Sequence, residues 1–100
     1  MNSMKETDIH KLLDEIIDEQ QISPYEQKEI LINYIKEGEY DINRACGKII
    51  NFSEDLKARF LLKSYVLYAR YKKIPEFKML FGGEYIGLQI EYYNQNSELS

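Results

Sequence analysis

The spacing of apolar residues near the start of the chain constrains the fold most strongly. Within residues 9–20, aliphatic side chains stand at Ile9, Leu12, Leu13, Ile16 and Ile17. This i, i+3, i+4, i+7, i+8 spacing lines one face of an α-helix, whereas a strand would need strict alternation. The segment is therefore predicted to be an amphipathic helix that buries its apolar stripe against other helices.

Capping residues predict the second helix. Ser23 and Glu26 form a capping box, and Pro24 stands at the first helical position, where its missing N–H costs nothing. Gly38 follows the apolar stripe and favours the left-handed conformation with which many helices end. We therefore expect this helix to span 24–37.

Two more helices are predicted in the middle of the chain. Asp41 is a suitable cap for a helix over 42–50, although Gly47 within it costs about 1 kcal/mol relative to alanine. Ser53 then begins the longest segment, 53–72, which is apolar on nearly all sides in its later part. Such a helix is typical of the centre of a bundle or of a contact with a second subunit.

The end of the chain permits two interpretations. Pro75 begins a short helical turn over 76–81, which Gly82 and Gly83 end. Residues 85–93 fit both strand-like alternation and helical spacing. Because the rest of the chain offers no second strand, we expect a helix here, with a dimer-forming strand as the alternative.

These segments together predict an all-α fold. We expect a small bundle of five to six short helices around the central helix 53–72, in one domain over 1–100 with frayed ends at 1–7 and 94–100. No apolar run reaches the roughly 18 residues of a membrane span, and the N-terminal segment lacks the apolar core of a signal peptide. A cytoplasmic protein without membrane contact is therefore expected.

The reactive side chains argue against enzymatic chemistry. Cys46 is the single cysteine and His10 the single histidine, too few for a zinc site. Cys46 lies in an apolar stripe and is expected to be a small core residue, because no base is placed to activate it. We therefore expect no enzyme, no metal ion and no cofactor.

Charge is unevenly distributed along the chain, whose formal net charge is −4. Residues 1–20 hold two basic and six acidic side chains, whereas residues 53–73 hold six basic and two acidic ones. Such a chain can neutralise much of its own charge between segments. Alternatively, one charged face binds a partner of opposite sign.

The leading functional interpretation is a non-enzymatic protein-interaction module. It would regulate or inhibit a larger complex, such as one that processes nucleic acid, as small acidic antagonists from phages and mobile elements do. The nine tyrosines support this interpretation, since tyrosine gains much at interfaces. The expected binding face consists of Asp14, Glu15, Asp18, Glu19 and Tyr25.

Two other functions stay open. A nucleic-acid-binding regulator would use a basic set on the longest helix: Lys57, Arg59, Arg70, Lys72 and Lys73. Residues 42–60 resemble a helix-turn-helix, but Glu54 and Asp55 stand where phosphates would lie, so the family is not assigned. The third possibility is a bacteriocin-immunity-type helical protein. A homodimer is slightly favoured over a monomer because the longest helix has surplus apolar surface.

Overall fold

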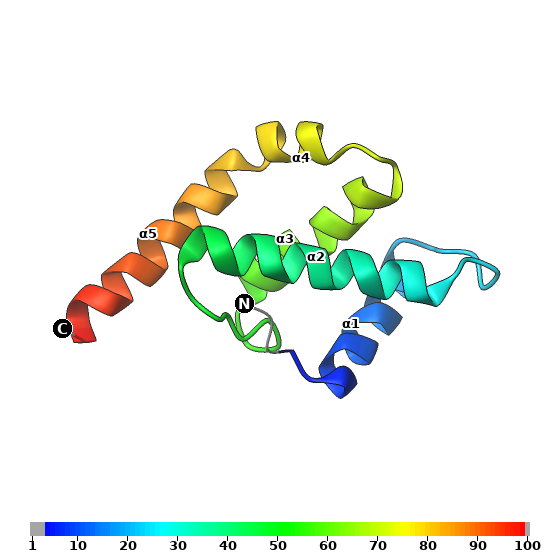
Figure 1. Ribbon diagram of the computed structural model, residues 1–100, viewed down its shortest axis with the longest axis horizontal. Coiled ribbons are helices and arrows are strands. Elements are labelled where there is room, and N and C mark those ends of the chain that lie inside the picture. Colours follow the sequence, from blue (N-terminus) through cyan, green and yellow to red (C-terminus); the bar gives the residue numbers. More distant parts are fainter. Residues whose placement is uncertain (1–3, 100) are drawn as a thin grey trace.

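The computed structural model describes the backbone of residues 4–99 and the side chains of residues 4–94. It contains five α-helices and, in this part of the chain, no strand, so the all-α prediction is confirmed. The helices are α1 (Glu6–Glu19), α2 (Lys28–Cys46), α3 (Leu56–Arg70), α4 (Ile74–Leu80) and α5 (Gly82–Leu99). Figure 1 shows the later part of α5 at one end of the long axis and the α1–α2 loop at the other.

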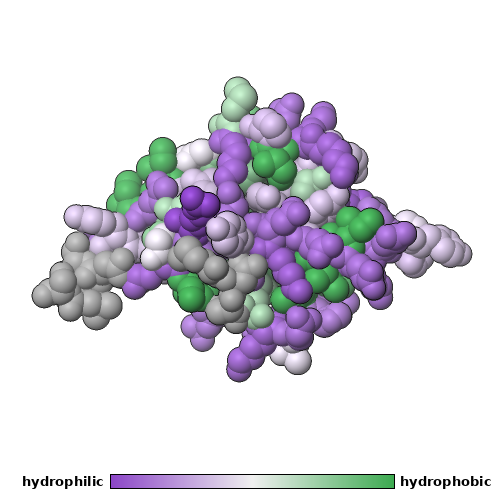
Figure 2. Space-filling model, viewed as in Figure 1, coloured by the Kyte–Doolittle hydropathy of each residue, from purple (hydrophilic) through white to green (hydrophobic). Residues whose placement is uncertain are grey.

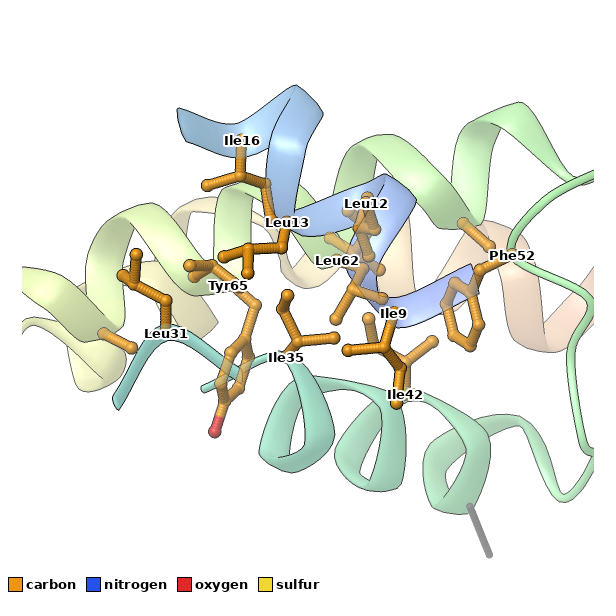
Figure 3. Packing of buried hydrophobic residues seen from close by; sticks show 14 of the residues in the cluster. Ile9, Leu12, Leu13, Ile16, Leu31, Ile35, Ile42, Phe52, Leu62 and Tyr65 are labelled. Atoms are coloured by element: carbon orange, nitrogen blue, oxygen red, sulfur yellow. The ribbon is translucent and has the colours of Figure 1, made fainter. Parts of the chain in front are cut away.

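Helix α1 confirms the prediction from the apolar stripe. It begins at Glu6 and buries Ile9, Leu12, Leu13 and Ile16. Figure 3 shows these side chains directed toward apolar residues of the neighbouring helices, including Ile35, Ile42, Leu62 and Tyr65. The stripe forms because each of its members returns to the same face of the helix.

Helix α2 differs most from the prediction. The expected pair of helices over 24–37 and 42–50 is wrong, because one continuous helix runs through Gly38. Gly38 is buried where α2 meets α3, and a Cβ atom added to it would lie 2.6 Å from Leu62 Cδ1 and 2.9 Å from Tyr65 Cδ1. The glycine therefore permits a close approach of two helices rather than a helix end.

The N-terminal end of α2 also departs from the predicted capping box. Ser23 accepts a 3.2 Å hydrogen bond at Oγ from the Tyr25 amide and a 3.0 Å bond at its carbonyl from the Glu26 amide, which closes a turn. The helix begins only at Lys28, after Gln27 in an extended conformation. The side chains that favoured a helix start therefore stabilise a turn instead.

The other end of α2 is set by Gly47 and not by Gly38. Gly47 has φ +65°, and its amide donates to the Arg44 carbonyl. This is the left-handed helix end that glycine favours, so the expectation that Gly47 lies inside a helix is wrong. Asp41, expected as a cap, lies within α2 and accepts hydrogen bonds from Lys78 and, at 2.5 Å, from the Tyr85 hydroxyl.

Helix α3 begins three residues later than predicted. Asp55 caps it by accepting a 3.0 Å hydrogen bond from the Ala58 amide. Ser53, the expected cap, donates its amide to Asn51 Oδ1 at 3.0 Å as part of a turn. Both residues are suitable caps by type, and only the turn before the helix decides between them.

The last two helices settle the ambiguity at the end of the chain. Helix α4 has Pro75 in its first turn, as predicted, whereas Gly82 and Gly83 open α5 instead of ending α4. Residues 85–93 are helical, so the strand alternative is wrong. The expected fraying at 1–7 and 94–100 stays a prediction, and residues 1–3 and 100 lie outside the described residues.

Two buried polar side chains of α2 accept hydrogen bonds from neighbouring segments of the chain. The Asn43 Oδ1 atom accepts a 3.0 Å hydrogen bond from the Ile50 amide, which holds the loop after α2. Glu39 Oε2 accepts a 2.9 Å hydrogen bond from the Met4 amide, which fixes the segment before α1. Both side chains are buried and hydrogen-bonded, as the cost of desolvating a polar group requires.

Gly38→Ala tests the close approach of α2 and α3. Alanine gains about 1 kcal/mol of helix propensity, but overpacking a buried contact costs about 1–3 kcal/mol. The net result should be a fall of up to about 2 kcal/mol in the free energy of unfolding, measured with urea. Gly83→Ala, where an added Cβ meets nothing within 4 Å, is the control and should not destabilise. Gly38→Ala that is as stable as Gly83→Ala would contradict the packing described.

Candidate functional site

The single histidine and the single cysteine lie on different helices. Cys46 ends α2 and is half-buried, and burial raises the pKa of its thiol. His10 is exposed on α1, with Nε2 4.0 Å from a Glu6 oxygen. Among residues with described side chains, no group of three or more His, Cys, Asp or Glu is placed to hold a metal ion. No helix in this part of the chain is long and apolar enough to cross a membrane.

Ion pairs join α1 to α3 along the acidic side of α1. The Glu15 carboxylate accepts hydrogen bonds from the Arg59 guanidinium, and Lys63 Nζ lies 2.9 Å from its Oε1. Lys63 also contacts Glu19 Oε2 at 2.9 Å. The acidic first segment and the basic middle segment of the sequence therefore neutralise each other across the α1–α3 contact, as one of the two interpretations of the charge pattern expected.

These contacts shift the titration of both partners. The hydrogen bonds to Arg59 and then to Lys63 lower the pKa of Glu15 from 4.5 to about 2, against the smaller opposing effect of burial. Burial alone would lower the pKa of Lys63, but its hydrogen bonds to Glu15 and Glu19 outweigh this effect and raise it. The pair is therefore charged at neutral pH and contributes to the α1–α3 contact.

Arg70 anchors the loop between α1 and α2, residues 20–27, which we name the Tyr25 loop. Its guanidinium contacts the Glu26 carboxylate at 3.2 Å and Gln20 Oε1 at 3.3 Å. Gln20 in turn donates from Nε2 to the Lys63 carbonyl at 3.1 Å. The loop is thus attached to α3 near both of its ends.

Tyr25 protrudes from this anchored loop. Its side chain is 94% exposed, the largest exposed fraction among the large hydrophobic side chains of residues 4–94. Figure 1 shows the loop at the far right of the molecule, at the end of the long axis opposite the later part of α5. An exposed aromatic side chain on a fixed backbone is suited to insertion into a pocket of a partner.

The structure divides the predicted acidic face into two groups. Asp14, Asp18 and Tyr25 are exposed, and no ion pair to either aspartate occurs among the described side chains. Glu15 and Glu19 instead bind the cations of α3. The opposite charges of residues 1–20 and 53–73 were a signal for this pairing, but the sequence does not show which carboxylates take part.

The predicted basic face is divided in the same way. Arg59 and Arg70 each have 13% of the side chain exposed, because both bind carboxylates of α1 or the Tyr25 loop. Lys72 donates to the Tyr34 hydroxyl at 3.0 Å, and Lys57 Nζ lies 3.9 Å from Glu91. Lys73 is exposed. Of the five cations, the two guanidinium groups are therefore turned to internal contacts.

The connection between α2 and α3 is also unlike a helix-turn-helix. Nine residues, 47–55, separate the two helices, whereas the turn of that motif has about three or four residues.

Comparison with models of protein families, with curated proteins and with solved structures finds no match to this chain.

Glu15→Gln tests the α1–α3 ion pairs. Since the Glu15 carboxyl has a lower pKa in the folded protein, its contribution to stability is present above pH 4.5 and is lost as the pH falls toward 2. At neutral pH we expect the free energy of unfolding of the variant to be about 1 kcal/mol lower than that of the wild type. The loss is no larger because the Glu15 side chain is 41% exposed. The difference from the wild type, measured by urea unfolding, should shrink toward zero at low pH.

Asp14→Asn is the matched control for this experiment. It removes a carboxylate of the same helix that has no cation partner among the described side chains, so its effect at neutral pH should be small. If the two variants lost equal stability relative to the wild type, this loss would come from the change in net charge and not from the contacts of Glu15.

Proposed function

We propose that this chain is a non-enzymatic protein-interaction module that regulates or inhibits a larger protein complex by binding a positively charged surface of it. The proposed contact residues are Asp14, Asp18 and Tyr25. The observation that carries the proposal is the exposure of Tyr25 on a loop that Arg70 attaches to α3. Glu15 and Glu19 belong to the same face but serve mainly to hold α1 on α3.

The fixed loop lowers the cost of binding. Ordering a mobile loop on association consumes free energy, whereas an anchored one has already lost that freedom. Tyrosine adds a large apolar surface and a polar hydroxyl with only two rotatable side-chain bonds, which suits it to the centre of an interface. Glu26 and Gln20, through Arg70, therefore act as positioning residues for Tyr25.

The charge of α1 supports a basic partner. Asp14 and Asp18 stand one helical turn apart on the solvent side, and the chain carries a formal charge of −4. Such a surface attracts a basic groove at long range and loses this effect at high salt. A groove that normally binds the phosphates of a nucleic acid has this chemistry, because carboxylates present similar oxygen acceptors.

The central helix and the cellular location of the protein belong to the same proposal. We assign α3, which packs against α2, α4 and α5, the role of central helix. We also assign the protein to the cytoplasm, where a nucleic-acid-processing partner would be met. The nucleic-acid-binding alternative receives less support, because Arg59 and Arg70 bind internal carboxylates.

The experiment is capture of the tagged protein from its native host, with and without nuclease. We expect a discrete protein partner that survives nuclease, is lost with Tyr25→Ala and weakens strongly with the double change Asp14→Lys and Asp18→Lys. Tyr40→Ala, which removes another exposed tyrosine, and the pair Glu54→Lys with Glu76→Lys, which alters charge equally elsewhere, are the controls.

Two results would contradict the proposal. Recovery that disappears with nuclease and leaves only nucleic-acid fragments would move the function to the basic residues of α3. A protein partner that binds the Tyr25 and Asp14/Asp18 variants as well as it binds the controls would show that another surface makes the contact.

A further inference from the structure

Helix α5 is only partly covered by the rest of the bundle. Its inner side is held by the Tyr85 hydroxyl, which donates to Asp41, and by the Tyr92 hydroxyl, which donates to Asp55. Figure 2 shows hydrophobic surface at the left of the molecule, on the side where α5 lies in Figure 1. The flank of α5 toward α3 is open as well, because the two helices leave a hollow between them.

The hollow between α3 and α5 has apolar walls and a volume of about 480 Å³. Leu56 and Phe60 line it from α3 and are 74% and 58% exposed, and Leu88 lines it from α5. A second hollow, of about 420 Å³, shares part of this lining and continues to Tyr92. The two hollows together form a groove along α5 from Glu84 to Tyr92, which we name the α3–α5 groove.

The shape of the α3–α5 groove suits a helix. Between Glu84 and Tyr92 the axis of α5 rises by about 12 Å, which is about two helical turns. A helix laid in a groove of this length contacts it with apolar side chains at i, i+3 or i+4, and i+7. An extended peptide would instead need the edge of a sheet, and the part of the chain that the structure describes has no strand.

Gly87 leaves the α5 backbone open beside the groove. A glycine inside a helix costs about 1 kcal/mol relative to alanine, so its presence needs a reason. Gly38 has one in its contact with α3, and Gly47 has one in its φ of +65°. Gly87 has neither, because its φ is not positive and an added Cβ atom would meet none of the described residues within 4 Å. The missing side chain instead permits a helix from outside to approach closely.

Carboxylates outnumber cations along the groove. Its lining includes the acidic side chains Glu54, Asp55, Glu84 and Glu91, and Lys57 is the one cation among these lining residues. Lys57 Nζ lies 3.9 Å from Glu91, whereas no ion pair to Glu54 or Glu84 occurs among the described side chains. Apolar walls with a surplus of carboxylates attract an apolar segment that is flanked by lysine or arginine.

The same charges argue against other occupants. A nucleic acid or an acidic peptide would meet like charge in the groove. A second copy of the chain, with groove set on groove by a symmetry axis, would add its own surplus of carboxylates to the first. A basic helix is the occupant that matches both the apolar walls and the charge.

We propose that the α3–α5 groove binds an amphipathic helix of another protein that carries basic residues on both sides of its apolar stripe. The stripe contacts Leu56, Phe60 and Leu88, and one of the flanking cations pairs with Glu84. This inference does not rest on the proposed function, since it uses α3 and α5 and not α1 or the Tyr25 loop. Figure 1 places that loop at the opposite end of the long axis from the later part of α5, so the two surfaces are distinct.

The test is an NMR titration of the isotope-labelled protein with a synthetic helical peptide of about 18 residues, or five turns. The peptide has leucines along one face, at i, i+3, i+4 and i+7, and lysines on both sides of this face. We expect the amide signals of Phe60, Gly87 and Leu88 to shift until the groove is saturated. A peptide with the same leucines and with glutamate in place of every lysine should bind about tenfold more weakly. High salt should reduce this difference.

Two variants with matched controls locate the contact. Gly87→Leu narrows the groove and should weaken binding of the basic peptide about tenfold, without lowering the unfolding midpoint, because the new side chain meets none of the described residues at its Cβ atom. Asn33→Leu adds the same side chain at an exposed position of α2 and should bind as the wild type does. Glu84→Lys should remove the preference for the basic peptide, whereas Glu76→Lys, the same change on α4, should retain it.

Any of three results would overturn the inference. The first is no saturable shift of the groove amides with the basic peptide at about 1 mM, or binding of the acidic peptide that is equally tight. The second is a folded Gly87→Leu protein that binds the basic peptide as well as Asn33→Leu does, which would place the contact elsewhere. The third is a shift of the same amides with the concentration of the protein alone, which would assign the groove to a second copy. None of these results depends on whether Tyr25 binds a partner.

Discussion

The close approach of α2 to α3 at Gly38 is the contact on which the rest of the structure depends. With no side chain at this position, Leu62 and Tyr65 lie directly against the α2 backbone, and α2 continues past the point where the sequence predicted its end. The continued helix carries Asp41, which holds Tyr85 and so fixes α5. It also carries Asn43, which holds the loop that leads to α3. The path of α2 through Gly38 therefore positions α5 through Asp41 and the loop before α3 through Asn43.

The sequence predicted what depends on neighbours within one helix. The stripe of α1 follows from the spacing of its apolar residues, and residues 85–93 were expected to be helical because the rest of the chain offers no second strand. The cap of α3, expected at Ser53, is instead Asp55, two residues later. The predictions at Gly38 and Gly47 were wrong because a glycine serves both a left-handed turn and a close contact, and only the tertiary structure separates these uses. The Ser23 turn shows the same limit, since serine stabilises turns as well as helix starts.

The candidate site was predictable in part for a related reason. The charge of each segment could be counted, and it correctly suggested internal neutralisation between residues 1–20 and 53–73. Which side chains remain free depends on pairs 44 residues apart, such as Arg59 with Glu15, and no local pattern reports these. The structure leaves Asp14, Asp18 and Tyr25 exposed. Internal pairing thus separates the polar surface that stabilises the fold from the surface available to partners.

Native-state hydrogen exchange, followed residue by residue by NMR, tests the continuity of α2 most directly. If Gly38 lies inside one helix packed on α3, the amides of residues 38–42 should be among the most protected in the protein and should exchange only with global unfolding. Fast exchange across 38–42, with separate protected segments before and after it, would show two helices joined by a turn. That result would contradict the account of how this chain folds and of how α5 is positioned.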